Sequence, residues 1–305
     1  MRVLVTGGAG FIGSNVVDLL ISKGHDVCVI DDLSSGRKKH VNDKATFYEM
    51  SILDDGIGKI IKDEDIECVI HHAAQINVRK SVEDPVFDAK INILGSLNLL
   101  ESSKDVKKFI FASTGGAIYG EPQYLPADES HPEKPLCPYG VSKLAFEKYL
   151  YMYREIYGLD YVSLRYGNVY GPRQDGHGEA GVVAIFADKM LKGERPTING
   201  DGNQTRDFVY VEDVARSNML AMEKSVNDRV INIGTGIETS VNEIFETIQK
   251  SLGTDISPVH GPAIKGEVEK ISLNVRRAKD ELGWRPEVSL DLGIERYLEF
   301  LKTTS

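Results

Sequence analysis

The amino-terminal segment places short apolar runs on either side of a glycine cluster. Val3-Leu4-Val5 precedes the glycines between positions 7 and 13, and apolar residues then recur at helical spacing from 16 to 21. A second apolar run, 27–30, ends in Asp31-Asp32. This order predicts a strand, a tight turn, a helix and a second strand.

Further short apolar runs at 68–70 and 109–112 alternate with segments of helical periodicity at 91–100 and 140–157. Continuous apolar runs suit strands that are covered on both faces of a parallel sheet. Strands alternating with helices are typical of an α/β fold. We therefore expect a Rossmann-type doubly wound parallel sheet within residues 1–165.

After Arg165 the residue pattern changes. Glycine and proline become frequent, and the apolar runs become shorter. We expect residues 166–305 to form mainly a smaller α/β substrate-binding domain. Segments at about 207–235 again combine strand-like and helix-like patterns, so we expect this part to return to the first domain.

Composition narrows the class of protein. The 305 residues are 41% apolar and 27% charged, as in an ordinary globular chain, and the net charge of −10 argues against nucleic-acid or anionic-membrane binding. No apolar stretch approaches the roughly 18–20 residues of a membrane span. The three cysteines lack the spacing of a metal site or a disulfide framework, so we expect no metal and a cytoplasmic protein.

Gly7, Gly10 and Gly13 form G-x-x-G-x-x-G between the predicted strand and helix. Such glycines let the backbone approach a pyrophosphate at the positive end of a helix, although a plain turn is the alternative. Asp31 follows at the end of the second strand, where a carboxylate binds ribose hydroxyls and repels a 2′-phosphate. The pattern favours NAD over NADP, with an acidic turn at Asp31 as the other interpretation.

Tyr139 and Lys143 stand four residues apart at the start of a predicted helix and so share one face. A phenol with a pKa near 10 is a poor base at neutral pH, and a neighbouring cation favours its ionised form. Alone this spacing is common by chance. Together with the glycine turn it predicts a proton-transferring pair beside a dinucleotide.

The motifs resemble those of the extended short-chain dehydrogenase/reductase family, and most closely its nucleotide-sugar epimerases. The resemblance rests on T-G-G-A-G-F-I-G at 6–13, D-D-L-S-S-G at 31–36, H-H-A-A-Q at 71–75, Asn92, S-T-G-G-A-I-Y-G at 113–120, P-Y-G-V-S-K at 138–143, L-R-Y-G-N-V-Y-G-P-R at 164–173, R-D-F-V-Y-V-E-D-V-A at 206–215, N-I-G-T-G at 232–236 and L-G-W-R-P at 282–286.

The resemblance implies that UDP-galactose and UDP-glucose are interconverted through a transient 4-keto sugar, with NAD as cofactor. The catalytic residues it implies are Tyr139, Lys143 and a hydroxyl from Thr114 or Ser113. The cofactor-binding residues it implies are Gly7, Gly10, Phe11, Ile12, Gly13, Asp31, Asp32, Leu33, Ser34, Ser35, Gly36, Ser51, Ile52, His72, Ala73, Ala74, Gln75, Asn92, Ser113, Tyr139, Lys143 and Tyr166. The substrate-binding residues it implies are Thr114, Tyr139, Asn168, Val182, Val183, Thr197, Asn199, Arg206, Lys265, Glu267 and Ile271.

Three positions depart from the family pattern. Gly115 replaces an expected hydroxyl residue, which leaves Ser113 and Thr114 as alternatives. Ile264 replaces a second diphosphate-binding arginine, so we expect Arg206, with Lys265 or Arg173 as further candidates, to carry more of the charge. Lys265 is otherwise a surface lysine. Ser51 replaces an acidic residue, which leaves the adenine contact to Ser51 and Ile52.

Several alternatives remain open. Epimerisation of UDP-N-acetylglucosamine or UDP-glucuronate is the main one, and Ile271 is either a gate near the hexose 2-substituent or core packing. A dehydratase is disfavoured because Gly116 and Ala117 carry no proton-transferring group. A non-catalytic NAD-binding regulator is disfavoured by the intact Tyr139 and Lys143. Apolar residues in 92–103 and 140–157 predict a homodimer, with a buried monomer pair of helices as the alternative.

Overall fold

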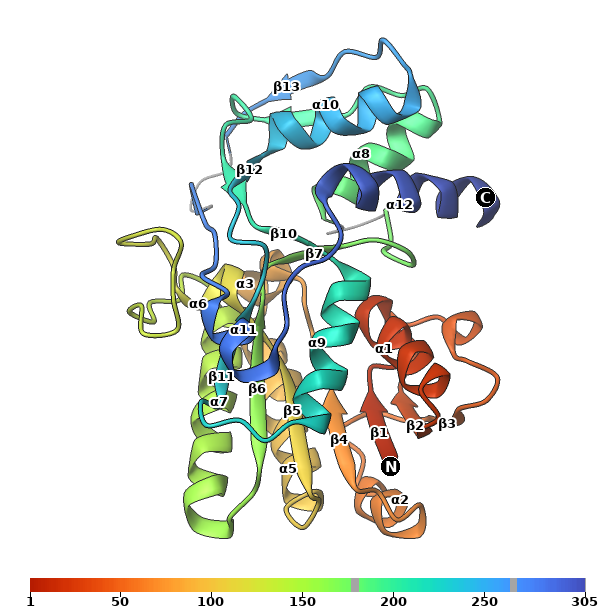
Figure 1. Ribbon diagram of the computed structural model, residues 1–305, viewed down its shortest axis with the longest axis vertical. Coiled ribbons are helices and arrows are strands. Elements are labelled where there is room, and N and C mark those ends of the chain that lie inside the picture. The colour runs from red at the N-terminus through yellow and green to blue at the C-terminus, as the bar shows by residue number, and fades with distance from the viewer. Residues whose placement is uncertain (177–180, 264–267, 305) are drawn as a thin grey trace.

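A computed structural model describes residues 1–176, 181–263 and 268–304. The chain forms two lobes (Figure 1). The larger lobe holds a central sheet with helices on both faces, and the smaller lobe holds the helices α8 (Val182–Leu191), α10 (Val241–Leu252) and α12 (Leu290–Thr304). None of the described helices is both long and apolar enough to cross a membrane.

The larger lobe is built on seven parallel strands. In spatial order they are β11 (Val230–Ile233), β6 (Tyr161–Tyr166), β5 (Lys108–Thr114), β4 (Cys68–His71), β1 (Arg2–Thr6), β2 (Asp26–Asp31) and β3 (Thr46–Glu49). The strand order reverses between β1 and β4, where a doubly wound sheet opens a crevice at the carboxyl ends of its strands. The predicted fold class is confirmed.

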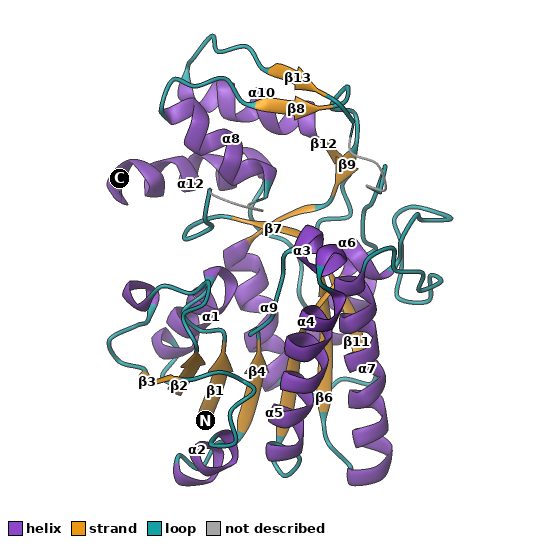
Figure 2. Ribbon diagram, turned by 180° about the vertical axis from the view of Figure 1, so that it is seen from behind, coloured by secondary structure: helices purple, strands orange, loops and turns teal. Residues whose placement is uncertain are grey.

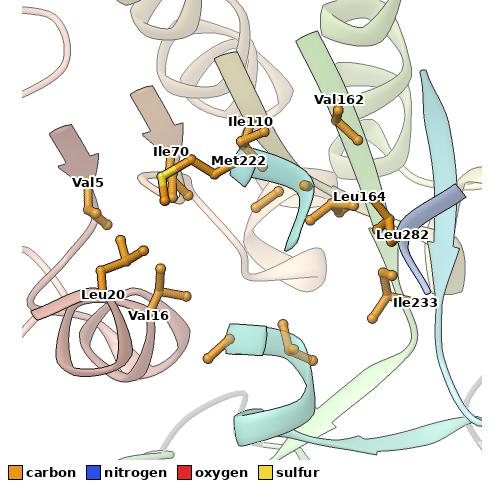
Figure 3. Close-up of a cluster of buried hydrophobic side chains, with 14 of the residues drawn as sticks. Val5, Val16, Leu20, Ile70, Ile110, Val162, Leu164, Met222, Ile233 and Leu282 are labelled. Atoms are coloured by element: carbon orange, nitrogen blue, oxygen red, sulfur yellow. The ribbon is translucent and has the colours of Figure 1, made fainter. Parts of the chain in front are cut away.

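Alternation along the strands buries both faces of this sheet. In β1, Val3 and Val5 join one apolar cluster and Leu4 joins the opposite one. The first cluster is covered by α1 (Phe11–Ser22), α9 (Val211–Glu223) and α11 (Arg276–Leu282), and Figure 3 shows part of it. The second is covered by α2 (Ile57–Asp63), α5 (Ser96–Ser102) and α7 (Pro138–Tyr157).

The chain leaves and re-enters the larger lobe. After β7 (Asn168–Tyr170) and α8, the strand β10 (Phe208–Tyr210) pairs with β7, α9 packs against α1, and β11 joins the sheet beside β6. Later α11 packs on β11 and α9, with its Ala278 and Leu282 in the sheet's core. This last return carries no strand, and no helix was predicted for its seven residues.

The remaining elements are short. Two strand pairs, β8 (Thr197–Asn199) with β13 (Val259–Gly261) and β9 (Thr205–Arg206) with β12 (Thr239–Ser240), lie outside the main sheet. The short helices are η1 (Lys38–His40), α3 (Val78–Glu83), α4 (Pro85–Ala89) and α6 (Gly115–Ile118). A π-helix, η2 (Lys90–Gly95), interrupts the regular helix that the periodicity of 91–100 predicts.

Candidate active site

The glycine turn joins β1 to α1 and leaves the start of the helix open. Gly7 has φ +70°, and Gly10 caps α1 without a side-chain hydrogen bond. A Cβ on Gly13 would lie 2.2 Å from the Gly7 carbonyl oxygen. The first amides of α1 therefore face a cradle that has no room for side chains, as a bound pyrophosphate requires.

Asp31 lies directly beside this turn. Its carboxylate is 7% exposed and accepts hydrogen bonds from the amides of Ala9 (3.0 Å) and Leu33 (2.9 Å). Burial raises the pKa of Asp31, and the two amide hydrogen bonds oppose that rise. A Cβ on Gly36 would lie 2.6 Å from an Asp31 oxygen, so the loop after β2 closes tightly over the carboxylate.

The other adenosine-side candidates differ in exposure. Asp32 is exposed and accepts from both the amide and the hydroxyl of Ser34. The Ser51 amide donates to Asp54, and Ile52 is buried in the second core cluster. Packing in that cluster holds the side chain of Ile52. The adenine contacts of Ser51 and Ile52 stay predictions.

A second group of cofactor candidates follows β4. The ring of His72 stacks on that of Tyr166, with 6.1 Å between centroids, and both side chains meet Asn218. Burial lowers the pKa of His72 to about 4, so it is neutral at physiological pH. Ala73 borders the glycine turn, because a Cβ on Gly7 would lie 2.6 Å from its amide nitrogen. The ends of β1 and β4 thus line one crevice.

Tyr139 and Lys143 lie in the first turns of α7, as predicted, with the Lys143 ammonium 5.8 Å from the centre of the Tyr139 ring. Lys143 is buried and donates to the carbonyl of Ala112 at 2.9 Å. Burial lowers the pKa of Lys143 to about 8. The side chain is therefore a cation held in a dry site, and its charge acts strongly on its neighbours.

Burial also acts on Tyr139. It raises the pKa of the phenol, and the nearby Cys137 and Asp88 raise it further. The lowering of this pKa that was expected from Lys143 is therefore not seen in the protein alone, where burial dominates. A further positive charge beside the phenol, such as that of an oxidised nicotinamide, favours ionisation.

The structure separates the two hydroxyl candidates that follow one another on β5. Ser113 is buried and donates to Glu147 at 2.5 Å. Thr114 points the other way, and a Cβ on Gly116 would lie 3.9 Å from its hydroxyl oxygen and 3.6 Å from the side-chain oxygen of Asn168. Thr114 and Asn168 thus border one space, which favours Thr114 for contact with the sugar.

Asn168 and Arg206, the diphosphate candidates, are linked through Asp207. The Asn168 amide donates to the Asp207 carbonyl at 2.6 Å, and the buried Asp207 carboxylate accepts from Thr235, Gly236 and Leu273. Arg206 donates to the Thr205 carbonyl at 2.8 Å. Asp207 therefore fixes the strands that carry both candidates, although the sequence reasoning gave it no role.

The remaining substrate candidates differ in their burial and in their contacts. Ile271 is 2% exposed and packs with Ile118, Tyr119 and Leu273, which favours the core-packing alternative over the gate. Val183 is buried in the core of the smaller lobe and Val182 packs against it. Thr197 is exposed on β8, and the Asn199 carbonyl accepts from Gln204. Lys265 and Glu267 lie outside the described residues, as does Ile264.

The structure also reveals a buried polar network that sequence reasoning missed. Arg165 and Glu147 form an ion pair at 2.6 Å, and Tyr119 and Glu133 complete the shell around the guanidinium. Glu147 follows Lys143 by four residues, and this spacing was the one signal in the sequence that could have indicated it.

Asn92 and Gln75, which were expected to bind the cofactor, form hydrogen bonds with each other and with Asp88. No group of possible metal ligands occurs among the described residues.

Comparisons with known proteins agree with this geometry. The model of the NAD dependent epimerase/dehydratase family matches residues 3–234. The UDP-glucose 4-epimerase of Mycolicibacterium smegmatis is 42% identical over the full length of both chains. The crystal structure of the Thermotoga maritima UDP-glucose 4-epimerase with UDP-glucose is 52% identical, with a TM-score of 0.97 and coverage of 100% of this chain and 99% of that one. The Thermus thermophilus UDP-glucose 4-epimerase with NAD is 43% identical, with a TM-score of 0.94 over the full length of both chains.

Proposed function

Because the chain belongs to the NAD dependent epimerase/dehydratase family, we propose that it is an isomerase that interconverts UDP-glucose and UDP-galactose at C4, with NAD as its cofactor. The observation that carries the proposal is the juxtaposition of Tyr139 and Lys143 on α7, with Thr114 on the neighbouring strand and a glycine turn that fits a dinucleotide. Gly116 and Ala117, which lie in α6, offer no acid or base for eliminating water.

Three side chains of the protein have separate roles in the reaction. NAD, when bound, supplies the acceptor and donor of the C4 hydride. Tyr139 takes the proton of the 4-hydroxyl at its phenol oxygen and returns it after the 4-keto sugar has turned over. Lys143 holds a positive charge 5.8 Å from the centre of the Tyr139 ring and stabilises the phenolate. Thr114 donates a hydrogen bond to the sugar oxygen, and the low polarity around the pair strengthens these interactions.

The diphosphate of the substrate is assigned to Asn168 and Arg206. A guanidinium binds phosphate oxygens through paired N–H donors, and an amide adds a neutral donor. Both residues lie on strands fixed by Asp207, so the distance between diphosphate and sugar contacts is set by the fold. This arrangement lets the 4-keto sugar rotate while the nucleotide stays bound.

A direct assay tests the proposal. Purified protein is incubated with UDP-glucose, UDP-N-acetylglucosamine and UDP-glucuronate in turn, without added NAD, and the 4-epimers are separated by chromatography. We expect the highest kcat/KM with UDP-glucose, since the relatives named as UDP-glucose 4-epimerases share 42% and 52% identity with this chain. Faster turnover of one of the other sugars would assign the enzyme to that substrate instead.

Cofactor choice is expected to depend on Asp31. Removing its carboxylate in Asp31→Ala eliminates the hydrogen-bond acceptor and the repulsion of a 2′-phosphate, so the preference for NAD over NADP should narrow by at least about tenfold, or about 1.4 kcal/mol. Equilibrium binding of both dinucleotides to the apoprotein measures it. Asp32→Ala, which alters the exposed neighbour, should change the preference less. Equal binding of NAD and NADP by the wild-type protein would contradict the role of Asp31.

We also propose that the enzyme is a homodimer. Exposed apolar side chains occur on α3, α4, η2 and α7, and they include Val78, Val82, Val86, Leu94, Val141 and Ile156. The helices α3, α4 and α7 lie on one side of the larger lobe (Figure 2), and η2 packs against α4 and α7. A monomer that leaves such a patch exposed gains free energy by pairing it with a second copy. Sedimentation of the purified protein measures its mass.

We also propose that the protein is cytoplasmic. Its three cysteines are free, and cysteines usually stay reduced in the cytosol.

A further inference from the structure

Asp88 is a fully buried acidic residue on α4, and its carboxylate receives three hydrogen bonds. Gln75 and Asn92 donate their side-chain amides to one oxygen at 2.9 and 3.0 Å, and Ser142 donates its hydroxyl to the other at 2.6 Å. Three donors and no acceptor around the two oxygens fit an ionised carboxylate. Sequence reasoning gave this residue no role.

The three donors come from three parts of the active site. Gln75 follows β4 at the edge of the cofactor crevice, Asn92 lies in the π-helix η2, and Ser142 lies on α7 between Tyr139 and Lys143. Asn92 also binds both the amide and the carbonyl of Gln75. A π-helix often marks a functional position, because it redirects one side chain out of the regular helical pattern. Asp88 therefore joins the cofactor crevice to the catalytic helix.

Asp88 contributes a negative charge to the active site in addition to its three hydrogen bonds. Among the described residues, no lysine or arginine lies within ion-pair distance of the Asp88 oxygens, and no carboxylate lies within that distance of Lys143. Glu147, a buried acid on α7, forms an ion pair with Arg165 and accepts a hydrogen bond from Ser113. Ser142 lies three residues after Tyr139 on the same face of α7. Its hydrogen bond to Asp88 places the Asp88 charge against the turn of α7 that carries Tyr139 and Lys143.

We propose that Asp88 is a positioning residue for the epimerisation, holding α7 against the cofactor crevice and setting, through its negative charge, the pH range in which Tyr139 accepts a proton and Lys143 stays protonated. The inference rests on the proposed function. It assigns Asp88 no contact with substrate or cofactor.

Two buried anions act on the pair, Asp88 and Glu147, and of these Glu147 is ion-paired with Arg165. Asp88 is the first of the charges that raise the pKa of Lys143, with Glu147 second, and it also raises the pKa of Tyr139. His71 ends β4 and His72 follows it, and the charge of Lys143 acts on both, but burial lowers both of their pKa values and leaves them neutral. Before α7, burial raises the pKa of the Cys137 thiol, which is likewise uncharged at neutral pH.

The sign of the effect is the same for both members of the pair. A negative charge favours the cationic form of Lys143 and disfavours the anionic form of Tyr139, so removing it lowers both pKa values. Asp88→Asn keeps the shape and removes the charge. We expect the whole profile of kcat/KM against pH, with its acid and alkaline limbs, to move to lower pH by about one unit. A purely structural role would lower the profile without moving it.

Ser142→Ala provides the matched comparison, because it removes one hydrogen bond and keeps the charge. It should lower activity without moving the profile. A spectroscopic readout adds a second test: the ultraviolet tyrosinate absorbance of each NAD-loaded protein is titrated, and the titration of its Tyr139→Phe counterpart is subtracted. The Tyr139 titration should move to lower pH in Asp88→Asn and stay in place in Ser142→Ala.

Asp88→Ser tests the same point if Asp88→Asn does not fold, because it also lacks the carboxylate and leaves room for a water molecule. A profile and a tyrosine titration that stay at the wild-type pH in whichever of these two variants folds would overturn the inference. Failure of the proposed function is distinguishable, since the wild-type protein would then lack epimerase activity while its tyrosine titration still reports on Asp88.

Discussion

Replacing Tyr139 with phenylalanine is expected to leave NAD bound and to lower kcat by about 10²–10⁴-fold, the contribution of a positioned acid–base group. The variant keeps the ring that packs in the site and lacks only the phenol oxygen. Without that oxygen the proton of the 4-hydroxyl has no acceptor when the hydride leaves C4. Turnover is measured with UDP-galactose, and bound NAD is quantified after the protein is denatured.

The structure supplies a control on the same helix. Tyr151 also lies on α7 but is 58% exposed, so Tyr151→Phe should retain turnover and bound cofactor. Thermal unfolding of both variants checks that the fold is intact. Near-normal turnover by Tyr139→Phe would assign the proton transfer to another group, and loss of NAD from that variant would show that the ring or its oxygen also holds the cofactor.

Much of the larger lobe could be predicted, because its determinants are local. The apolar runs at 3–5, 27–30 and 68–70 all became strands buried on both faces, and the glycines between β1 and α1 need no information from elsewhere in the chain. The spacing of Tyr139 and Lys143 was likewise sufficient, since a helix fixes which residues share a face.

The contacts that tune the site could not be predicted in this way. The choice between Ser113 and Thr114 depends on which face of β5 each occupies, and this follows only once Glu147 and Arg165 are placed behind the strand. Asp88 reaches Ser142 across 54 positions of sequence, through a short helix that precedes a π-helix. No periodicity in the chain reports such a contact.

The same limit explains the smaller lobe. Its core is formed by α8, α10 and α12, which are separated by the segments that return to the sheet, so its members are far apart in the chain. Val183 and Ile271 were expected at the substrate, yet both side chains are buried among apolar neighbours. A resemblance identifies positions, whereas the direction of a side chain at such a position depends on packing.

Gly13→Ala is expected to abolish tight NAD binding and, with it, activity. Its Cβ would lie 2.2 Å from the Gly7 carbonyl oxygen and 2.8 Å from the Gly7 carbonyl carbon, and backbone atoms have no rotamer by which to move away. The turn must therefore open, which displaces the first amides of α1 from the pyrophosphate and costs about 1–3 kcal/mol of stability. The cofactor content of the purified variant and its thermal unfolding measure both effects. Gly58→Ala is the control, because its Cβ in α2 would meet Ser102 only at 3.4 Å and alanine favours a helix over glycine. Stoichiometric NAD in Gly13→Ala would show that the cofactor does not depend on the close packing of this turn.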